Sequence, residues 1–256
     1  MAEDGKKQPQ VDLIVEARMA SERLPGKVLL MGADRPMLEH FIERGRSIPL
    51  VDNVIIATTE NAADDLIVET AERMQTKVFR GSEDDVLGRV LETAYLFSTD
   101  IIVEITGDNP LFDPGIANSV IEAFLDNESE IEYAANDLKW TYPIGFNTRV
   151  FRTETLAKVA ALTGHPVDRE HVVNYFVKHP DKFRTLNIEA EGIYRRDDIR
   201  LTMDTANDYL LVRTVFRALY NDNPLFTAKD IITFLGENPD ISNINRDIVQ
   251  RAYSYD

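Results

Sequence analysis

The sequence predicts an α/β protein built around a mostly parallel β-sheet with helices on both faces. Two observations lead to this prediction. Short apolar runs alternate with amphipathic segments along the first half of the chain, which is typical of parallel sheets covered by helices. Polar and charged stretches follow several of these runs, and open parallel sheets bind ligands at the carboxyl ends of their strands.

The elements of the first half follow in a regular order. The apolar run 12–17 predicts a buried strand, and the segment 36–48 predicts a helix because its apolar residues recur at helical spacing. The same alternation predicts strands at 53–59, 77–81, 100–108 and 131–136 and helices at 62–74, 83–98 and 115–127. This order predicts three layers, with the sheet between two layers of helices.

The pattern changes after about residue 136. Residues 137–151 contain the single Trp together with a Pro and a Gly, which favours a hairpin-like excursion. Residues 243–256 are expected to pack as a tail. The remaining pattern predicts helices at 153–162, 168–179, 206–220 and 228–238, and strands at 183–192 and 198–205.

The composition indicates one globular domain over residues 11–256. The chain has 256 residues, of which 44% are hydrophobic, and this is enough for a buried core. Residues 1–10 are polar, lack the apolar core of a signal peptide and are interpreted as a flexible tail. No apolar run approaches the length of a membrane span, and the absence of Cys excludes disulfides and thiolate chemistry. We therefore expect a cytoplasmic protein.

The charge distribution directs attention to one loop. The formal net charge of -16 repels nucleic acid and anionic membranes, so neither is expected as a partner. Against this background three cations, Arg18, Arg23 and Lys27, lie close together in EARMASERLPGKVLL, residues 16–30. They follow a strand rather than lining a helix face, so a merely solvated charge cluster is the less favoured interpretation.

This loop has the residue types that hold phosphate groups. Arginine presents a planar fork to phosphate oxygens and lysine presents a point charge. Gly26 allows a close approach of the backbone, and Ser21 can donate a hydrogen bond. The loop lacks the dinucleotide and P-loop glycine patterns, but it still predicts a polyphosphate site.

Two carboxylates follow later predicted strands. Asp108, in ITGDNP, could hold Mg²⁺ opposite the cationic loop, although the same residues also suit a simple turn. Asp204, in RLTMDTANDY, could cap the helix that follows it, face a metal, or do both. Together the two carboxylates would suit one or two magnesium ions spanning a triphosphate.

Taken together, these motifs resemble the cytidylyltransferases that activate acidic sugars, a family that includes the sialic acid and Kdo enzymes. EARMASERLPGKVLL is similar to their nucleotide-binding signature. The branch named after SpsF, a spore-coat polysaccharide protein, is matched in order from about residue 11 to residue 215 by VFRGSEDDVLGRVLETA, ITGDNPLFDP, YPIGFNTRVF, REHVVNYF and RLTMDTANDY. The resemblance implies the three-layer, GT-A-like fold of nucleotide-diphospho-sugar transferases.

The resemblance also implies an activity. CMP would be transferred from CTP to an anionic acceptor with release of pyrophosphate and with Mg²⁺ as cofactor, for surface polysaccharide or related cell-envelope biosynthesis. A homodimer is implied, with residues 137–180 at the interface or over the acceptor. The alternative from another class is a glycosyltransferase that uses a nucleotide sugar; the cationic loop with Lys27 argues against it, because pyrophosphate release needs triphosphate contacts.

Roles for individual residues follow from the same resemblance. Arg18, Lys27 and Asp108 would be catalytic, and Asp108 and Asp204 would bind the metal. His171 is a candidate general base for a sugar hydroxyl, or else a residue that only packs. The nucleotide-binding set comprises Ala17, Arg18, Met19, Ser21, Arg23, Lys27, Thr58, Arg80, Gly81, Ser82, Thr106 and Asp108, and the acceptor-binding set comprises Asn147, Arg149, Arg169, His171 and Arg200.

The chain departs from the branch at three positions. Glu104 stands where Arg is frequent, and Asn147 and Arg149 stand where acidic residues are common. Losing two acids and gaining a cation favours a more anionic acceptor, which makes a phosphate or phosphonate a competitor of a sugar acid. Alternatively, Arg149 pairs with Glu104 in a swapped salt bridge, and the acceptor is then an ordinary acidic sugar.

Overall fold

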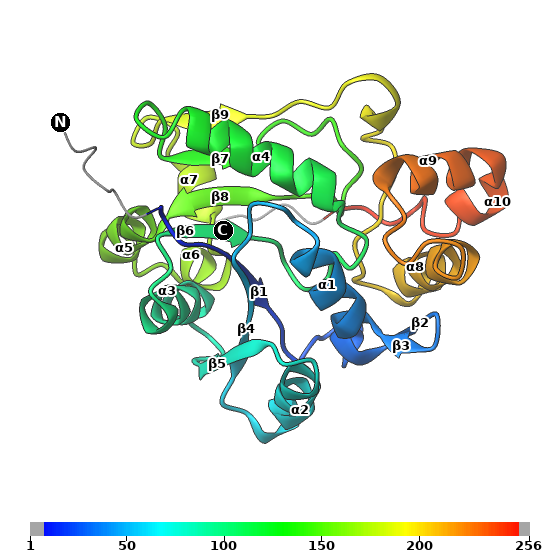
Figure 1. Cartoon of the computed structure of the whole chain (residues 1–256), viewed down its shortest axis with the longest axis horizontal. Coiled ribbons are helices and arrows are strands. Elements are labelled where there is room, and N and C mark those ends of the chain that lie inside the picture. The colour runs from blue at the N-terminus through cyan, green and yellow to red at the C-terminus, as the bar shows by residue number, and fades with distance from the viewer. Residues whose placement is uncertain (1–7, 251–256) are drawn as a thin grey trace.

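A seven-stranded sheet forms the centre of the protein (Figure 1). The computed structural model describes residues 8–250. The strand order is β5-β4-β1-β6-β8-β7-β9. The strands are β1 Val11–Glu16, β4 Asn53–Thr59, β5 Lys77–Gly81, β6 Ile101–Glu104, β7 Tyr133–Ala135, β8 Arg149–Arg152 and β9 Thr185–Asn187. Strand β8 is antiparallel to both of its neighbours, and the remaining pairings are parallel. The mostly parallel sheet is therefore confirmed.

Helices cover both faces of this sheet, as predicted (Figure 1). Leu13 and Val15 of β1 pack against residues of α1, α2 and α4, whereas Ile14 faces α3, α5 and α7. This alternation follows from the period of two along a strand. The helices are α1 Met37–Arg46, α2 Asp65–Arg73, α3 Val86–Phe97, α4 Pro114–Asp126, α5 Thr153–Leu162, α6 Pro166–Glu170, α7 Asn174–Lys178, α8 Ala206–Leu219, α9 Ala228–Glu237 and α10 Pro239–Ser242, with 3₁₀ turns η1 Lys27–Leu29, η2 Ala62–Asp64 and η3 Gly192–Tyr194.

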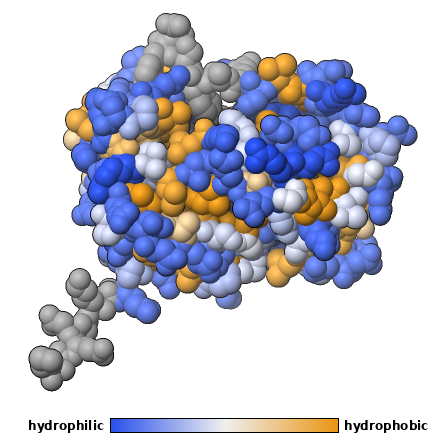
Figure 2. Space-filling view, turned by 90° about the horizontal axis from the view of Figure 1, so that it is seen from above, coloured by the Kyte–Doolittle hydropathy of each residue, from blue (hydrophilic) through white to orange (hydrophobic). Residues whose placement is uncertain are grey.

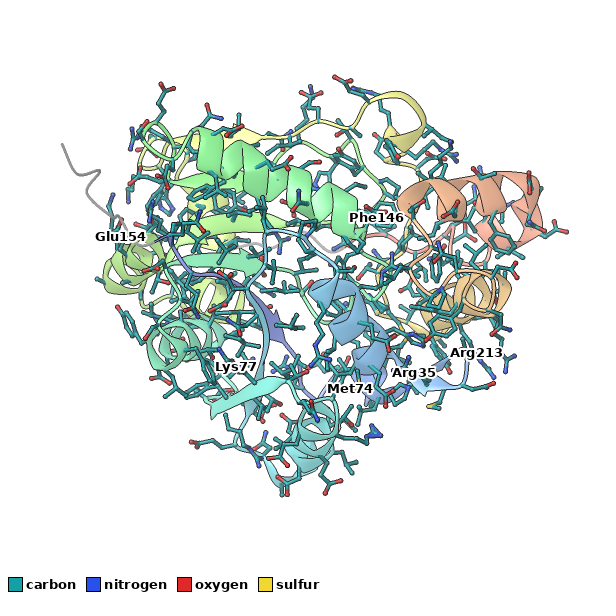
Figure 3. All side chains as sticks on the ribbon, in the orientation of Figure 1. Arg35, Met74, Lys77, Phe146, Glu154 and Arg213 are labelled. Atoms are coloured by element: carbon teal, nitrogen blue, oxygen red, sulfur yellow. The ribbon has the colours of Figure 1, made fainter. Side chains whose placement is uncertain are left out.

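A separate apolar cluster joins the C-terminal helices to α1 and α4. Helices α8, α9 and α10 lie together at one flank of the molecule (Figure 1). Phe146 is fully buried between α4 and this flank (Figure 3). A small hairpin of β2 Met31–Gly32 and β3 Arg35–Pro36, which the sequence did not predict, packs at the same side. Arg35 holds it by bonding Glu39 of α1 at 2.9 Å and Tyr220 at 2.7 Å.

The surface agrees with the charged composition. Viewed from above the orientation of Figure 1, it is largely hydrophilic, with apolar patches between the polar groups (Figure 2). Within residues 8–250, no helix is both long enough and apolar enough to cross a membrane. The tail predicted for residues 1–10 falls mainly outside the described residues, as do residues 251–256 of the predicted C-terminal tail.

The structure corrects three predicted elements. Residues 198–205 form no strand, because their alternating apolar residues pack into the α8–α9 cluster instead, and only Arg200 bridges Ile144. The helix predicted at 168–179 is two short helices, α6 and α7, separated by extended backbone at His171. The excursion predicted at 137–151 ends in β8, which pairs antiparallel with β7 and lies inside the sheet.

A buried ion-pair network crosses the sheet where β6 meets β8. Glu104 lies directly opposite Arg149 in the β6–β8 register, and the two side chains pair at 2.9 Å. Asp137 pairs with the same arginine at 2.7 Å. The side chain of Glu104 is only 2% exposed and that of Arg149 14%. The swapped salt bridge is therefore confirmed.

Glu16 lies beside this network at the end of β1. Ile14 pairs with Glu104 in the β1–β6 register, so Glu16, two residues later, projects from the same face of the sheet. Its Oε1 atom is buried without a hydrogen-bond partner among the described residues. Burial, and then the charge of Glu104, hold the pKa of Glu16 well above its ordinary value, although Arg89 and Arg149 oppose the shift. Burial also raises the pKa of Glu104, against the effect of Arg149.

Replacing Arg149 should destabilise the sheet strongly. Arg149→Met leaves Glu104 and Asp137 buried without their counter-charge, which typically costs about 3–5 kcal/mol. Urea denaturation measures this loss. The double variant Glu104→Leu/Arg149→Met should lose clearly less than the sum of the two single variants, because it removes a pair rather than one partner. Simple additivity would show that the pair does not act as a unit.

Glu16→Gln should change the pH dependence of stability. Because the pKa of Glu16 is raised in the folded state, folding is favoured while the carboxyl is protonated and loses free energy as the pH rises from the unfolded pKa, about 4.3, through the folded value. Glutamine does not titrate, so the variant should gain stability over the wild type on going from pH 4 to pH 8. Urea denaturation at both pH values tests this, with exposed Glu60→Gln as the control. A Glu16→Gln effect of equal size at both pH values would contradict it.

Candidate active site

The cationic loop after β1 folds back through backbone hydrogen bonds. The Gly26 N–H donates to the carbonyl of Met19 at 2.9 Å, and the Leu29 N–H donates to the carbonyl of Gly26 at 2.9 Å. Gly26 has φ +67°, a left-handed conformation that glycine adopts without strain. The second bond starts η1, whose first residue is Lys27. The turn thereby directs Lys27 toward the carboxyl edge of the sheet.

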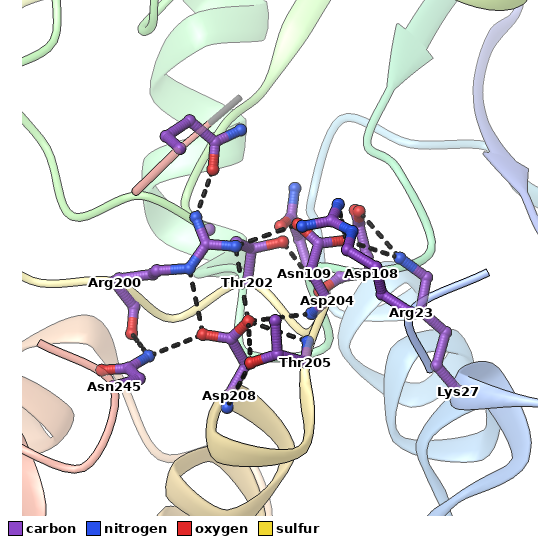
Figure 4. A network of polar contacts seen from close by, with 12 residues as sticks. Arg23, Lys27, Asp108, Asn109, Arg200, Thr202, Asp204, Thr205, Asp208 and Asn245 are labelled. Carbon is purple, nitrogen blue, oxygen red and sulfur yellow. Dashed lines mark hydrogen bonds and ion pairs between the residues drawn. The ribbon is translucent and has the colours of Figure 1, made fainter. Parts of the chain in front are cut away.

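Lys27 bridges the two predicted metal ligands (Figure 4). Its Nζ donates to Asp108 at 3.1 Å and to Asp204 at 3.0 Å. Arg23 also reaches Asp204, at 3.3 Å. These residues come from the loop after β1, the loop after β6 and the segment before α8, so the topology brings together side chains that are distant in sequence.

Lys27 and Asp108 each favour the charged form of the other. Burial lowers the pKa of Lys27, but Asp108 and Asp204 outweigh burial and raise it above its ordinary value. Burial raises the pKa of Asp108, but Lys27 and a hydrogen bond from Thr106 outweigh it, so the pKa is lowered. The Thr106 hydroxyl donates to Asp108 at 2.6 Å and accepts from Asn109 at 3.0 Å. Lys27 and Asp108 are therefore both charged at neutral pH.

Asp204 is held from its other side by Arg200, at 2.9 Å (Figure 4). The interpretation that Asp204 caps the following helix is wrong. Thr205 is the N-cap of α8 and forms a capping box with Asp208: its hydroxyl accepts from the Asp208 N–H at 3.2 Å, and the Asp208 carboxylate accepts from the Thr205 N–H at 2.9 Å. Because Thr205 fills the capping position, the carboxylate of Asp204 is free to turn toward Lys27.

Arg200 contacts both Asp204 and Asp208 and so fixes the segment before α8. Its Nε donates to Asp208 at 3.0 Å, and a hydrogen bond from Asn245 to the same carboxylate, at 2.8 Å, completes the contact. The predicted role of Arg200 in acceptor binding stays a prediction. Asp208 and Asn245 were not among the residues that the sequence singled out, although the T-x-x-D spacing of the capping box could have identified Asp208.

Asp108 and Asp204 form a donor set that fits a hydrated magnesium ion. Within residues 8–250, no group of three or more His, Cys, Asp or Glu side chains is arranged to hold a metal. Magnesium usually takes one or two carboxylates and fills its other positions with water and substrate phosphates. The pair therefore fits a metal that shares its ligands with a phosphate group rather than one enclosed by protein.

Arg18 lies apart from Lys27, across from α6. Its guanidinium faces Glu83 at 3.6 Å and Glu170 at 3.7 Å, and its side chain is 37% exposed. Arg169 on the same helix bonds Asp85. Burial lowers the pKa of His171, and the charges of Arg149 and Arg18 add to this effect against Glu170. His171 is therefore mainly neutral at pH 7, the state in which imidazole accepts a proton.

The residues predicted to lie near the cytosine and to close the nucleotide pocket stand at the ends of β4 and β5 and directly after β5. Thr58 is fully buried and donates to Asp64 at 3.1 Å. Arg80 donates to the carbonyls of Thr59 at 2.9 Å and Asn61 at 2.7 Å. Their predicted nucleotide contacts stay predictions, as do those of the neighbouring residues Gly81, which has no room for a Cβ beside Phe79, and Ser82, which accepts from the Asp85 N–H.

The other predicted residues lie along the same edge. Ala17 is buried and its N–H donates to the carbonyl of Ala57 at 3.2 Å, while Ser21 is partly exposed. Asn147 donates to Asp137 at 2.8 Å, the carboxylate that also binds Arg149. The contacts of Asn147 and Arg149 with an acceptor stay predictions.

Asp64, which the sequence did not single out, joins the cationic loop to β4. Its carboxylate accepts from the Met19 N–H at 2.7 Å. The signal for it was the polar stretch ATTENAADD after a buried strand, but nothing in that stretch shows which of its acidic residues turns inward.

Comparisons with known proteins identify the family of this chain. A family model described as Cytidylyltransferase matches residues 13–231. The spore coat polysaccharide biosynthesis protein SpsF of Bacillus subtilis is 32% identical over 232 residues, which are 89% of this chain and 94% of SpsF. A 3-deoxy-manno-octulosonate cytidylyltransferase of Trichlorobacter lovleyi is 37% identical over 119 residues, 46% of each chain.

A solved structure also matches the fold over nearly the whole chain. The solved structure of a cytidylyltransferase from Leptospira borgpetersenii superimposes with a TM-score of 0.87 at 32% identity, covering 95% of this chain and 100% of that one. The match of the family model over most of the chain shows the family directly. The chain therefore belongs to the cytidylyltransferase family and is a CTP-dependent nucleotidyltransferase.

Proposed function

We propose that the protein transfers CMP from CTP to an anionic small-molecule acceptor and releases pyrophosphate. The observation that supports this most is the convergence of Lys27 with Asp108 and Asp204 at the carboxyl edge of the sheet. A triphosphate needs cations for its leaving group and carboxylates for its metal, and both occur here within hydrogen-bond distance. Family membership argues against the glycosyltransferase alternative.

The transfer requires alignment and charge neutralisation more than covalent chemistry by the protein. An acceptor oxygen attacks the α-phosphorus of CTP, the bond to the β-phosphate bridging oxygen breaks, and pyrophosphate leaves with that electron pair. Lys27 and Arg23 would move from the carboxylates to the phosphates and neutralise the leaving group. Asp108 and Asp204 would hold Mg²⁺, and a bound Mg²⁺ supplies electrostatic stabilisation of the phosphate oxygens.

The acceptor we propose is an acidic sugar. Arg149 already gives its guanidinium fork to Glu104 and Asp137, so a phosphate placed there would meet two carboxylates. Arg18 is the more available cation, because its ion pairs are long and its side chain is partly exposed. The relatives named for spore-coat polysaccharide and for 3-deoxy-manno-octulosonate also favour a sugar acid and a role in surface polysaccharide or cell-envelope synthesis.

A sugar hydroxyl needs a proton acceptor when it attacks, whereas a carboxylate or phosphate oxygen does not. His171 is the candidate for this role, because its lowered pKa keeps the ring neutral. We also propose one catalytic domain over residues 11–256 that acts in the cytoplasm as a homodimer. Residues 137–180, which include the partly exposed Trp140, would contribute to the dimer interface or cover the acceptor.

Turnover of an acceptor panel tests the activity and its substrate class. Pyrophosphate release is measured with CTP, Mg²⁺ and sialic-acid-like sugars, octulosonates, phosphorylated small molecules or phosphonates. We expect turnover of a sugar acid, and a loss of about 100-fold or more in Asp108→Ala with its thermal unfolding unchanged, because its role is ligation at a loop. The exposed Asp222→Ala serves as the control. Turnover confined to phosphates or phosphonates would refute the sugar acceptor, and an active Asp108→Ala would refute the metal assignment.

Lys27 should distinguish CTP from CMP. Lys27→Met removes a cation that would bind the outer phosphates, where charged hydrogen bonds contribute on the order of 1.5–3 kcal/mol. Calorimetric titration should therefore show CTP binding weakened by roughly 10- to 100-fold and CMP binding little changed. Lys229→Met, which removes an exposed lysine of α9, is the control. Equal losses for the two nucleotides would remove Lys27 from this role.

A further inference from the structure

Asp64 is a buried carboxylate between two loops of the active site. It is 2% exposed and ends η2, shortly after β4. Besides the Met19 N–H, it accepts from the Thr58 hydroxyl at 3.1 Å, the Thr59 hydroxyl at 2.5 Å and the Thr59 N–H at 3.2 Å. Among the described residues no lysine or arginine forms an ion pair with it, so its hydrogen bonds come from neutral donors.

These bonds fix the cationic loop to the sheet. Asp64 holds the amide of Met19 at 2.7 Å, and the carbonyl of Met19 holds the amide of Gly26. Gly26 immediately precedes Lys27, and Arg18 immediately precedes Met19. The position of both cations therefore depends on a chain of hydrogen bonds that begins at the Asp64 carboxylate.

The other donors lie on the segment that the family resemblance places near the cytosine. Thr58 and Thr59 end β4, and Arg80 of β5 holds the same segment by bonding the carbonyl of Thr59 and the carboxylate of Asp65. One carboxylate thus joins the loop assigned to the phosphates and the segment assigned to the base, and it sets the spacing between them.

We propose that Asp64 is a positioning residue that pre-organises the CTP site by locking the cationic loop to the end of β4. This inference rests on the proposed use of CTP by that loop. A loop held in its binding conformation before the nucleotide arrives loses less conformational entropy on binding. Weakening the hydrogen bonds of Asp64 should therefore weaken CTP binding without removing any group that touches CTP.

A matched pair of variants separates positioning from general stability. Asp12 is also fully buried, and its side-chain donors among the described residues are neutral: Gln10 at 2.8 Å, Asn53 at 2.7 Å and Thr99 at 2.5 Å. It lies near the start of β1, at the opposite edge of the sheet from Lys27. Asp64→Asn and Asp12→Asn both replace a charged acceptor of several hydrogen bonds by an isosteric amide, but only one of them supports the cationic loop.

Calorimetric titration with CTP and Mg²⁺, without acceptor, tests the proposal. Asp64→Asn should weaken CTP binding by about tenfold or more, as expected when hydrogen bonds to a charged group are weakened. Asp12→Asn should change it less than about twofold, and urea denaturation should show comparable losses of stability. Unchanged CTP binding in Asp64→Asn, or equal weakening in both variants, would overturn the proposal. A wild type that binds no CTP would overturn the proposed function itself.

Hydrogen exchange on the wild-type protein provides a test that needs no variant. The amide of Met19 should be protected in the free protein, because its N–H is bonded to a buried carboxylate before any nucleotide is present. Adding CTP should change this protection little. Fast exchange of the Met19 amide in the free protein, followed by protection on addition of CTP, would show that the nucleotide orders the loop and would overturn the proposal.

Discussion

The contact of Lys27 with Asp108 and Asp204 is the interaction on which the active site depends. Two carboxylates this close repel each other unless a cation lies between them. Lys27 supplies that cation, and Arg23 and Arg200 add to it at Asp204. Arg200 also pairs with Asp208 at 3.0 Å, so three cations face three carboxylates and the charges here balance. A triphosphate accompanied by a divalent cation can exchange partners here without leaving any group unpaired.

The backbone makes this contact possible through two local constraints. The left-handed turn at Gly26 reverses the chain so that Lys27 returns to the sheet, and Asp64 fixes the start of that turn. Across from it, Gly107 packs against the carbonyl of Glu16, where a Cβ would come within 2.6 Å. The loop after β6 therefore approaches the end of β1 this closely only because residue 107 is a glycine.

The sequence predicts correctly those strands whose hydrophobic pattern is visible in their own residues. Strands β1, β4 and β6 are buried on both faces, so each is a nearly continuous apolar run that stands out from its surroundings. Strand β8 was not predicted because a charged residue stands at each of its ends, Arg149 and Arg152. The partner that neutralises Arg149 lies 45 residues away in the sequence. The segment 198–205 shows the converse: its apolar alternation is genuine, but a cluster of helices rather than a neighbouring strand covers it.

The residues of the site also divide into those that the sequence indicates and those that only the folded structure reveals. Residue types and their positions after strands indicated Lys27 and Asp108, because strand ends meet at one edge of a parallel sheet. Asp204 was indicated by a strand predicted at 198–205, which the structure does not contain. Asp64 could not be identified in this way, since only the folded structure shows which acid of an acidic stretch turns inward. Whether Asp204 caps the following helix likewise could be decided only from the position of Thr205.

In the proposed function, Lys27 can leave its carboxylate partners for a ligand more easily than Arg149 can. Lys27 makes one contact with each of two carboxylates, and a divalent metal can take its place there. Arg149 makes hydrogen bonds through all three guanidinium nitrogens to Glu104 and Asp137, and within residues 8–250 neither carboxylate has an ion pair with a second cation. Withdrawing it toward an acceptor would leave two carboxylates buried and unpaired, which is strongly unfavourable. Under the proposed function Arg149 would therefore stay with its two carboxylates, and a more exposed cation such as Arg18 would recognise the anionic group of the acceptor.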